Sequence, residues 1–188
     1  SVGFAKIKHS LSNMKLKNID KYIQSYDVEK YLFTVIGPKI RKKKYLSFND
    51  FYQIVMWKSV RPKLRYISNQ KQIEQISKRA LSQSSEVEKI QTLCELNGVG
   101  IPTASAILTI IYPEKYAVID IRCLEALNDI LKIKISKSIS LKTWLKYLEI
   151  MRNIAKENNV TPRKLDMALF AMHKENLDKQ KYRNLYSS

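Results

Sequence analysis

The sequence predicts an all-α protein, and three observations support this fold class. Apolar residues recur every three or four positions along most of the chain, which is the periodicity of amphipathic helices. Helix-capping patterns precede several of these segments, such as Ser47 with Asp50 and Thr161-Pro162. Strand patterns are nearly absent: only Ile133 and Ile135 alternate with lysines, and a single strand would have no partner.

The expected helices follow one another with short connections. The first covers Asn18–Ile36 and is expected to stop at Gly37-Pro38, a dipeptide typical of turns. The last begins at Thr161-Pro162, and the polar residues Asp178–Ser188 at its far end are expected to be mobile. Trp144 belongs to an apolar helical stripe and is expected in the core. The other helices are expected over Ser47–Trp57, Asn69–Leu81, Ser84–Leu96, Ile101–Ile111 and Leu141–Asn158.

Composition and charge limit the class of protein. The chain has 188 residues, of which 45% are hydrophobic, so it can fill a core as one domain or as two small lobes folded together. Lysine and arginine total 34 against 17 acidic residues, and the net charge of +17 favours a polyanionic partner such as nucleic acid. A lysine-rich composition from an AT-rich genome is the alternative, but it does not explain the deficit of acidic residues.

The sequence also indicates where the protein acts. It contains no apolar run of about 18 residues and no apolar stretch near its start, so neither a membrane helix nor a signal peptide is expected. Two cysteines, Cys94 and Cys123, are too few for a disulfide scaffold. We therefore expect an intracellular protein, cytoplasmic or associated with the nucleoid, with no membrane partner.

Two of the four glycines lie together in the segment Leu96–Gly100, between two expected helices. Glycines allow a tight turn and a close approach to a phosphate, and the N-terminus of the next helix offers free N–H groups to that phosphate. This helix-hairpin-helix arrangement predicts that Gly98, Val99, Gly100 and Thr103 bind DNA phosphates without reading base sequence. The alternative is a glycine that only caps the first helix, which explains one glycine better than two.

A single acidic residue, Asp120, lies in the apolar segment Tyr116–Arg122, 20 residues after Gly100. An aspartate in this setting is most often the N-cap of a helix and less often a buried functional carboxylate. The residues alone leave both interpretations open.

The chain from about Ile90 to Leu127, which contains LNGVGIPTASAILTIIYPEKYAVIDIR at residues 96–122, resembles the signature of the helix-hairpin-helix DNA glycosylase superfamily. Its spacing from the hairpin to the aspartate matches the endonuclease III branch. The resemblance implies a two-lobed helical fold. Residues 30–116 would form the middle lobe, with the hairpin motif at about 86–112, and residues 1–29 plus 117–188 the second lobe. It also implies a cleft for a flipped nucleotide, Asp120 as the catalytic carboxylate, and Na⁺ or K⁺ bound by the backbone carbonyls of Leu96 and Val99.

The sequence lacks two features that many members of this family have: a lysine after the hairpin and the cysteines of an iron–sulfur cluster. Bifunctional members carry a lysine two residues after the second hairpin glycine, where this chain has Pro102, so the resemblance implies a monofunctional enzyme. A lysine elsewhere, such as Lys58, Lys63 or Lys115, is the alternative nucleophile, although nothing in the sequence favours one of them. Only Cys123 follows the aspartate, so no four-cysteine iron–sulfur cluster is expected. With two histidines in the chain, no side-chain metal site or other cofactor is expected either.

The segment Trp57–Tyr66 interleaves aromatic and cationic residues, which suits contact with phosphates and an exposed base. The alternative is a loop anchored by its tryptophan, with its cations solvated. Asp166, on the last expected helix, is predicted to make a hydrogen bond between helices. The candidate DNA contacts in the segment are Trp57, Lys58, Arg61, Lys63 and Arg65.

These observations and the resemblance predict a monofunctional DNA N-glycosylase that acts in DNA repair, as a monomer on double-stranded DNA. Breaking a base–sugar bond builds positive charge on the sugar, and the Asp120 carboxylate would stabilise that charge or activate water. The target base leaves the stack, most easily when it is damaged, modified or mismatched. Two alternatives stay open: a non-catalytic module that binds duplex DNA, and a bifunctional glycosylase and abasic-site lyase with a relocated lysine.

Overall fold

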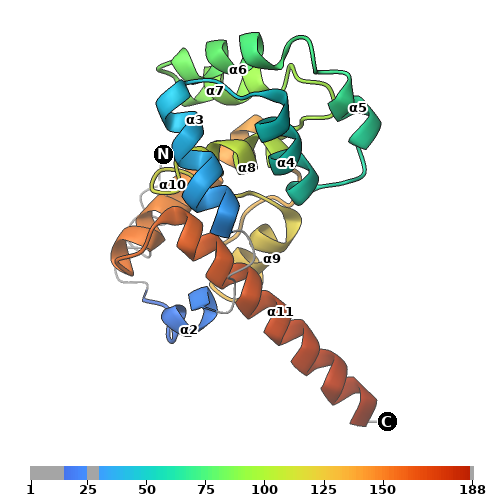
Figure 1. Ribbon diagram of the computed structural model, residues 1–188. Helices are drawn as coiled ribbons and strands as arrows, with labels where there is room; N and C mark the ends of the chain where they lie inside the picture. The colour runs from blue at the N-terminus through green and yellow to red at the C-terminus, as the bar shows by residue number, and fades with distance from the viewer. Residues whose placement is uncertain (1–14, 25–29, 187–188) are drawn as a thin grey trace.

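The computed structural model describes residues 15–24 and 30–186, which form helices joined by turns (Figure 1). This part of the chain contains no β-strand. The predicted all-α class is therefore confirmed. Ile133 and Ile135 lie in an irregular connection in which both side chains are buried.

The N-terminal helical part differs from the expected single helix. α2 covers Ile19–Gln24, and a π-helix, η1 (Leu32–Ile36), runs directly into α3 (Gly37–Lys43). The expectation that Gly37-Pro38 stops a helix is wrong, because the proline lies in the first turn of α3, where its fixed φ suits the helix. The N–H of the glycine donates across the wider π-turn to the Leu32 carbonyl. Residues 25–29 of the predicted helix lie outside the described residues.

Gly37 brings α3 close to α8 (Ile101–Ile111), a helix in which every residue from 103 to 111 is buried. A Cβ atom on Gly37 would overlap the backbone carbonyl oxygen of Ile110, so only glycine allows this approach. Arg41, in the last turn of α3, donates a hydrogen bond to the Ile111 carbonyl at the C-terminal end of α8. The basic run at residues 41–44 therefore supplies a helix cap as well as surface charge.

Of the next four helices, two begin directly after a serine that caps them. α4 (Phe48–Lys58) begins after Ser47, whose hydroxyl accepts the Asp50 N–H at 3.2 Å, as predicted. α5 (Lys63–Ile67) is a short helix, and α6 (Ile73–Ser82) begins four residues later than expected. α7 (Glu86–Leu93) begins after Ser85, which accepts the Glu88 N–H at 3.3 Å. Side-chain caps thus mark the starts of α4 and α7, whereas α5 and α6 begin without one.

The C-terminal part contains α9 (Ile121–Asp129), α10 (Leu141–Glu157) and α11 (Pro162–Tyr186). The polar end of the chain, which was expected to be mobile, is helical as far as residue 186, because α11 continues through it; its mobility stays a prediction. Figure 1 shows the C-terminal half of α11 extending away from the other helices. Within the described residues, no helix combines the length and apolar composition needed to cross a bilayer.

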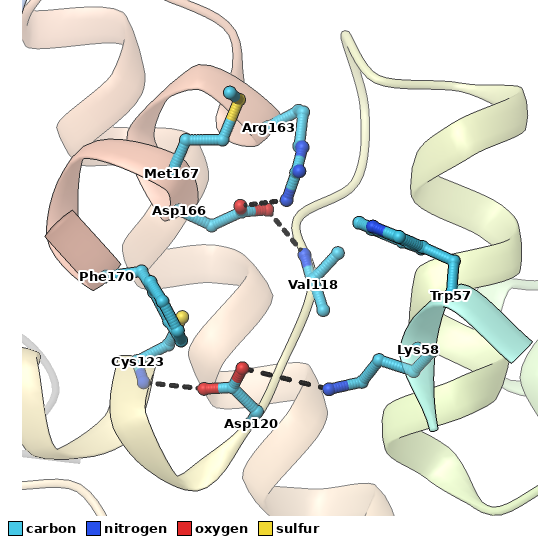
Figure 2. A pocket seen from close by; sticks show the side chains of 9 residues that line it. All are labelled: Trp57, Lys58, Val118, Asp120, Cys123, Arg163, Asp166, Met167 and Phe170. Carbon is cyan, nitrogen blue, oxygen red and sulfur yellow. Dashed lines mark hydrogen bonds and ion pairs between the residues drawn. The ribbon is translucent and has the colours of Figure 1, made fainter. Parts of the chain in front are cut away.

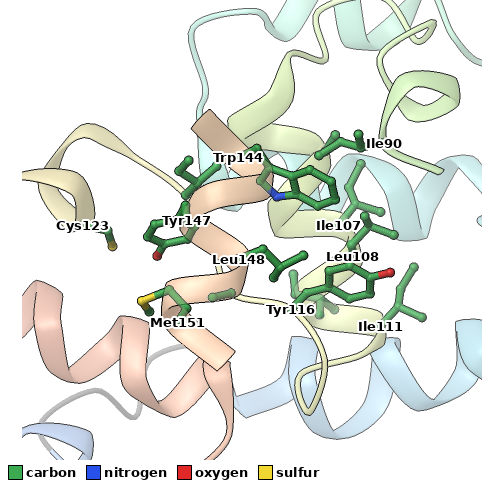
Figure 3. Packing of buried hydrophobic residues seen from close by; sticks show 14 of the residues in the cluster. Ile90, Ile107, Leu108, Ile111, Tyr116, Cys123, Trp144, Tyr147, Leu148 and Met151 are labelled. Atoms are coloured by element: carbon green, nitrogen blue, oxygen red, sulfur yellow. The ribbon is translucent and has the colours of Figure 1, made fainter. Parts of the chain in front are cut away.

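The core forms where α10 packs beside α7 and α8 (Figure 3). Trp144 is fully buried, as predicted, and its ring stacks on Tyr116 with a centroid separation of 6.4 Å and an interplanar angle of 9°. Figure 3 shows Trp144 and Leu148 of α10 facing Ile90 and Ile107. This packing fixes the segment between α8 and α9, which carries Asp120.

The helices that pack most closely fall into two sets. η1 and α3 to α8 contact one another, and α2, α9 and α10 contact α11. Residues of both sets belong to one continuous hydrophobic core. Because the core is continuous, the division into a middle lobe at 30–116 and a second lobe stays a prediction.

Candidate active site

The hairpin between α7 and α8 uses its two glycines differently. Gly98 has a φ of +82°, and a Cβ there would lie 3.0 Å from the Tyr66 ring and 3.1 Å from Pro62. Gly100 is the extended N-cap of α8, and a Cβ there would meet only Pro102, at an ordinary 3.8 Å. Internal packing therefore requires Gly98 but leaves open space beside Gly100. Neither glycine caps α7, whose C-cap is Cys94, so that alternative for the hairpin is wrong.

A buried asparagine holds the hairpin in place. Asn69 Nδ2 donates to the Asn97 carbonyl at 2.9 Å, and Asn69 Oδ1 accepts the Asn97 N–H at 2.8 Å. The Asn97 side chain in turn donates to the Ser68 hydroxyl at 2.8 Å. The basic segment that ends at Tyr66 is therefore attached directly to the hairpin. Asn69 lies before α6, which begins at Ile73. Nothing in the spacing of Asn69 and Asn97 signals this contact.

The other predicted phosphate-binding residues are less accessible. Val99 is 6% exposed, and its N–H donates to the Leu96 carbonyl at 3.1 Å. Thr103 is also buried, and its hydroxyl faces that of Tyr66. Within the hairpin, Asn97 and Gly100 are exposed and Gly98 is half-buried. Cation binding at the Leu96 and Val99 carbonyls stays a prediction.

Asp120 is both the N-cap of a helix and part of a cavity lining. The N-cap interpretation is therefore correct, and the position in a cavity leaves a functional role open. Its Oδ1 accepts the Cys123 N–H at 2.8 Å as the N-cap of α9. Its carboxylate also lines a cavity of about 290 Å³, together with Trp57, Lys58, Asp166 and Phe170 (Figure 2). The second oxygen, Oδ2, therefore remains directed toward the cavity.

One of the three candidate lysines lies beside this carboxylate. Lys58, the last residue of α4, has its Nζ 3.7 Å from Asp120 Oδ2. Figure 2 shows the two side chains entering the cavity from opposite sides. Lys63 is exposed on α5, and the Lys115 Nζ lies 6.0 Å above the Tyr112 ring; neither lines the cavity. Of the three lysines that the sequence could not rank, Lys58 is therefore the one that lies beside Asp120.

A second cavity adjoins the first at Asp120 and Phe170. It has a volume of about 360 Å³, and its other lining residues are Pro102, Ile121, Arg122 and Ile139. Pro102 is in the first turn of α8, immediately after the hairpin. The hairpin and Asp120 are therefore neighbours in space, as the resemblance implies, with the proline where bifunctional members carry lysine.

Asp166 and Arg163 form the buried wall of the first cavity. Asp166 Oδ2 accepts the Val118 N–H at 2.7 Å, and Oδ1 pairs with Arg163 Nη1 at 2.5 Å. The Arg163 guanidinium also lies 4.7 Å from the ring centroid of Phe33 and 5.5 Å from that of Trp57. The expected bond between helices is wrong, because Asp166 binds the backbone of the segment before α9 and an arginine on its own helix.

Burial changes the protonation chemistry of this wall. Burial raises the pKa of Asp166 to about 7, against the opposing effects of the Arg163 charge and the Val118 N–H. The negative charge of Asp120 raises the pKa of Asp166 further. Burial also raises the pKa of the Cys123 thiol well above its usual value, so this sulfur is a neutral thiol at physiological pH.

Trp57 and the predicted cations separate in space. Trp57 is half-buried in the cavity lining, with its ring edge-on to Phe33 at 6.1 Å. Arg61, Lys63 and Arg65 are exposed and line neither cavity. Two residues of the predicted DNA-contacting segment, Trp57 and Lys58, therefore line the cavity. The other three, Arg61, Lys63 and Arg65, lie at the surface beside the hairpin.

Sequence reasoning did not foresee that α11 forms one side of the cavity. Its cavity-lining residues recur at helical spacing, a pattern that could have grouped them on one face. Arg122 on α9 covers one of these α11 residues, Phe170, with its guanidinium 5.1 Å from the ring centroid. The α11 residues that line the cavity are Arg163, Asp166, Met167 and Phe170.

Comparisons with known proteins add no relative: no family model, curated protein sequence or solved structure matches this chain. Across residues 15–24 and 30–186, no three His, Cys, Asp or Glu side chains come together to hold a metal ion. The cavity, its carboxylates and its amine are therefore the features that bear on function.

Proposed function

We propose that this protein is a DNA N-glycosylase that removes a damaged, modified or mismatched base by hydrolysis. One observation carries the proposal: the Asp120 carboxylate faces a cavity of single-base size beside a glycine hairpin. The hairpin resemblance suggests this class of reaction, and a cavity of this size beside Asp120 supports it. Repair of DNA is the setting in which such a reaction is useful.

The proposed chemistry uses the two oxygens of Asp120 differently. The Cys123 N–H fixes Oδ1, which sets the orientation of the carboxylate. The cavity-facing Oδ2 stabilises positive charge as it develops on the sugar, or takes a proton from the attacking water. A partly buried carboxylate is suited to this role because the surrounding protein screens charge less than bulk water does.

The cavity offers a stacking site for a flipped base. Trp57 and Phe170 are aromatic parts of its lining, and aromatic faces stack well on bases. Its volume of about 290 Å³ is at the lower limit of small-molecule pockets, which are typically about 300 Å³ or more. One base is therefore a better match for the cavity than an extended ligand.

The surface beside the hairpin is proposed to hold the DNA backbone. Gly100 is exposed and Gly98 is half-buried, and Arg61, Lys63 and Arg65 are exposed on the segment that Asn69 attaches to the hairpin. These groups suit phosphates on a double-stranded partner, and the net charge of +17 has the sign that such a partner requires. A monovalent cation at the hairpin carbonyls and a nucleotide cleft between two lobes are part of the same proposal.

A lesion panel tests the proposal. Duplexes carrying uracil, alkylated purines, oxidised guanine or deaminated adenine are incubated with the protein, and released bases are separated by chromatography. We expect one class of base to be released, which leaves an abasic site in the duplex at that position. If every duplex is bound but no base is released from any of them, the proposal fails.

A non-catalytic DNA-binding module is the second candidate. The observation in its favour is that Asp120 already has two structural partners, the Cys123 N–H and the Lys58 ammonium. An aspartate kept only as a helix cap would show the same contacts. Salt-sensitive binding to duplex DNA without base release would identify this function.

A further inference from the structure

We propose that Lys58 is a second catalytic residue at this site: its amine condenses with the abasic sugar and leads to cleavage of the DNA strand. The proposal rests on the proposed function for its substrate, because the abasic sugar is the product of base release. It makes the protein a bifunctional glycosylase and lyase, although the hairpin position that would hold a lysine is Pro102.

The position of Lys58 carries the inference. Its side chain is only 17% exposed, and its Nζ is 3.7 Å from the carboxylate that would sit against the sugar. α4 is anchored by Phe51, Ile54 and Val55, which are fully buried, so the end of this helix is held at the cavity. An amine placed beside that carboxylate is within reach of the same sugar carbon.

The contact between Lys58 and Asp120 does not fully occupy either group. A separation of 3.7 Å is too long for a hydrogen bond, so the ammonium is attracted to the carboxylate without being tied to it. The N-cap bond of Asp120 uses its other oxygen. The amine therefore remains available for chemistry.

The proposed step balances without an oxidant or reductant. The Lys58 ammonium first gives a proton to water; the free amine then adds to the C1′ aldehyde of the opened abasic sugar, and loss of one water leaves an imine. The Asp120 carboxylate takes the C2′ proton, and the electron pair released at C2′ forms a double bond as the C3′–O bond breaks. The phosphate leaves with the bonding pair, and water then hydrolyses the imine to free the amine and an unsaturated aldehyde.

Borohydride trapping on a preformed abasic site tests Lys58 without depending on which base is recognised. Sodium borohydride reduces an imine to a stable amine, so the wild-type protein should become covalently attached to the duplex. Mass spectrometry of the digested adduct should place the DNA on Lys58. Lys58→Ala should abolish trapping, and Lys115→Ala should retain it, because Lys115 lies outside the cavity.

Lys58→Arg controls for the possibility that Lys58→Ala fails to fold. It keeps a positive charge beside Asp120 but cannot form the imine. It should bind the abasic duplex and fail to be trapped. Wild-type protein that binds the duplex without forming an adduct, or an adduct on any other amine, would overturn the assignment. Base release without trapping would refute Lys58 alone, whereas trapping without release from any lesion would refute the glycosylase proposal alone.

Discussion

Asp166 on α11 accepts the backbone N–H of Val118 at 2.7 Å, just ahead of Asp120 in the chain. Asp166 is 2% exposed and also pairs with Arg163 on the same helix. Because Val118 precedes the N-cap of α9, this contact fixes the segment that directs Asp120 into the cavity. The position of Asp120 therefore depends on a residue from the far end of the sequence.

The raised pKa of Asp166 predicts a specific dependence of stability on pH. The folded protein holds this proton up to about pH 7, whereas the unfolded carboxyl releases it near its model value of 3.8. The stabilising contribution is therefore complete below the unfolded pKa and is lost as the pH rises through the folded pKa. Asp166→Asn cannot titrate, so the stability advantage of wild type over this variant should shrink between pH 5 and pH 8.

Urea unfolding at the two pH values measures this change. At about 1.4 kcal/mol per pKa unit, the advantage should fall by up to about 3 kcal/mol. A difference in unfolding free energy that stays constant or grows with pH would show that the Asp166 pKa is not raised. Asp120→Asn should weaken the same pH dependence, because the Asp120 charge contributes to the shift.

The two hairpin glycines should respond differently to alanine. Gly98→Ala places a Cβ against Tyr66 and Pro62 at a positive φ, which costs about 1–2 kcal/mol for the backbone alone. Gly100→Ala meets only ordinary contact and should change stability by about 0.5 kcal/mol or less. We expect Gly100→Ala instead to weaken DNA binding, because the new methyl group occupies the space open to a phosphate.

Thermal unfolding and fluorescence anisotropy with a labelled duplex separate the two effects. If Gly100→Ala binds the duplex as tightly as wild type, the hairpin is not the phosphate-binding element.

Removal of the Asn69 side chain should loosen the hairpin. Asn69→Ala deletes both side-chain bonds to Asn97 and leaves buried polar groups, a loss of about 1–3 kcal/mol. Amide hydrogen exchange at residues 96–100 should become faster. Gln70→Ala is the matched control, since Gln70 is the exposed neighbour of Asn69. Equal exchange rates in the two variants would contradict the role of Asn69.

The surface cations should act through phosphates. Alanine in place of Arg61, Lys63 or Arg65 should each weaken duplex binding and reduce the slope of log affinity against log salt by about 1. Lys156→Ala, which removes an exposed charge at the end of α10, is the control. If Lys156→Ala lowers the slope as much as the other three, binding depends on net charge and not on this surface.

The sequence predicted local structure where the deciding chemistry is local. Ser47, Ser85 and Thr161 cap their helices as expected, because a cap needs only a side-chain oxygen and the next turn. Gly37-Pro38 was misjudged as a helix stop. Gly37 is needed because a Cβ there would overlap the Ile110 carbonyl oxygen on α8. This contact is distant in sequence, so no local pattern could predict it.

The candidate site was predictable in part for the same reason. Asp120 and the hairpin lie within one continuous segment, whose spacing is visible in the sequence. Lys58 comes from the end of α4 and Asp166 from α11, and their meeting depends on how the helices pack. The sequence singled out both residues, but it offered no means of placing either one beside Asp120.

Single-turnover base release by Asp120→Asn tests the central claim most directly. Asparagine is as good an N-cap as aspartate, so the variant should keep the fold and the bond to Cys123. On the substrate that the lesion panel identifies, we predict a rate at least about 100-fold below wild type with unchanged duplex affinity. Asp129→Asn, on the same helix with a 63% exposed side chain, should match wild type. Base release by Asp120→Asn at the wild-type rate would contradict the assignment of Asp120 as the catalytic carboxylate.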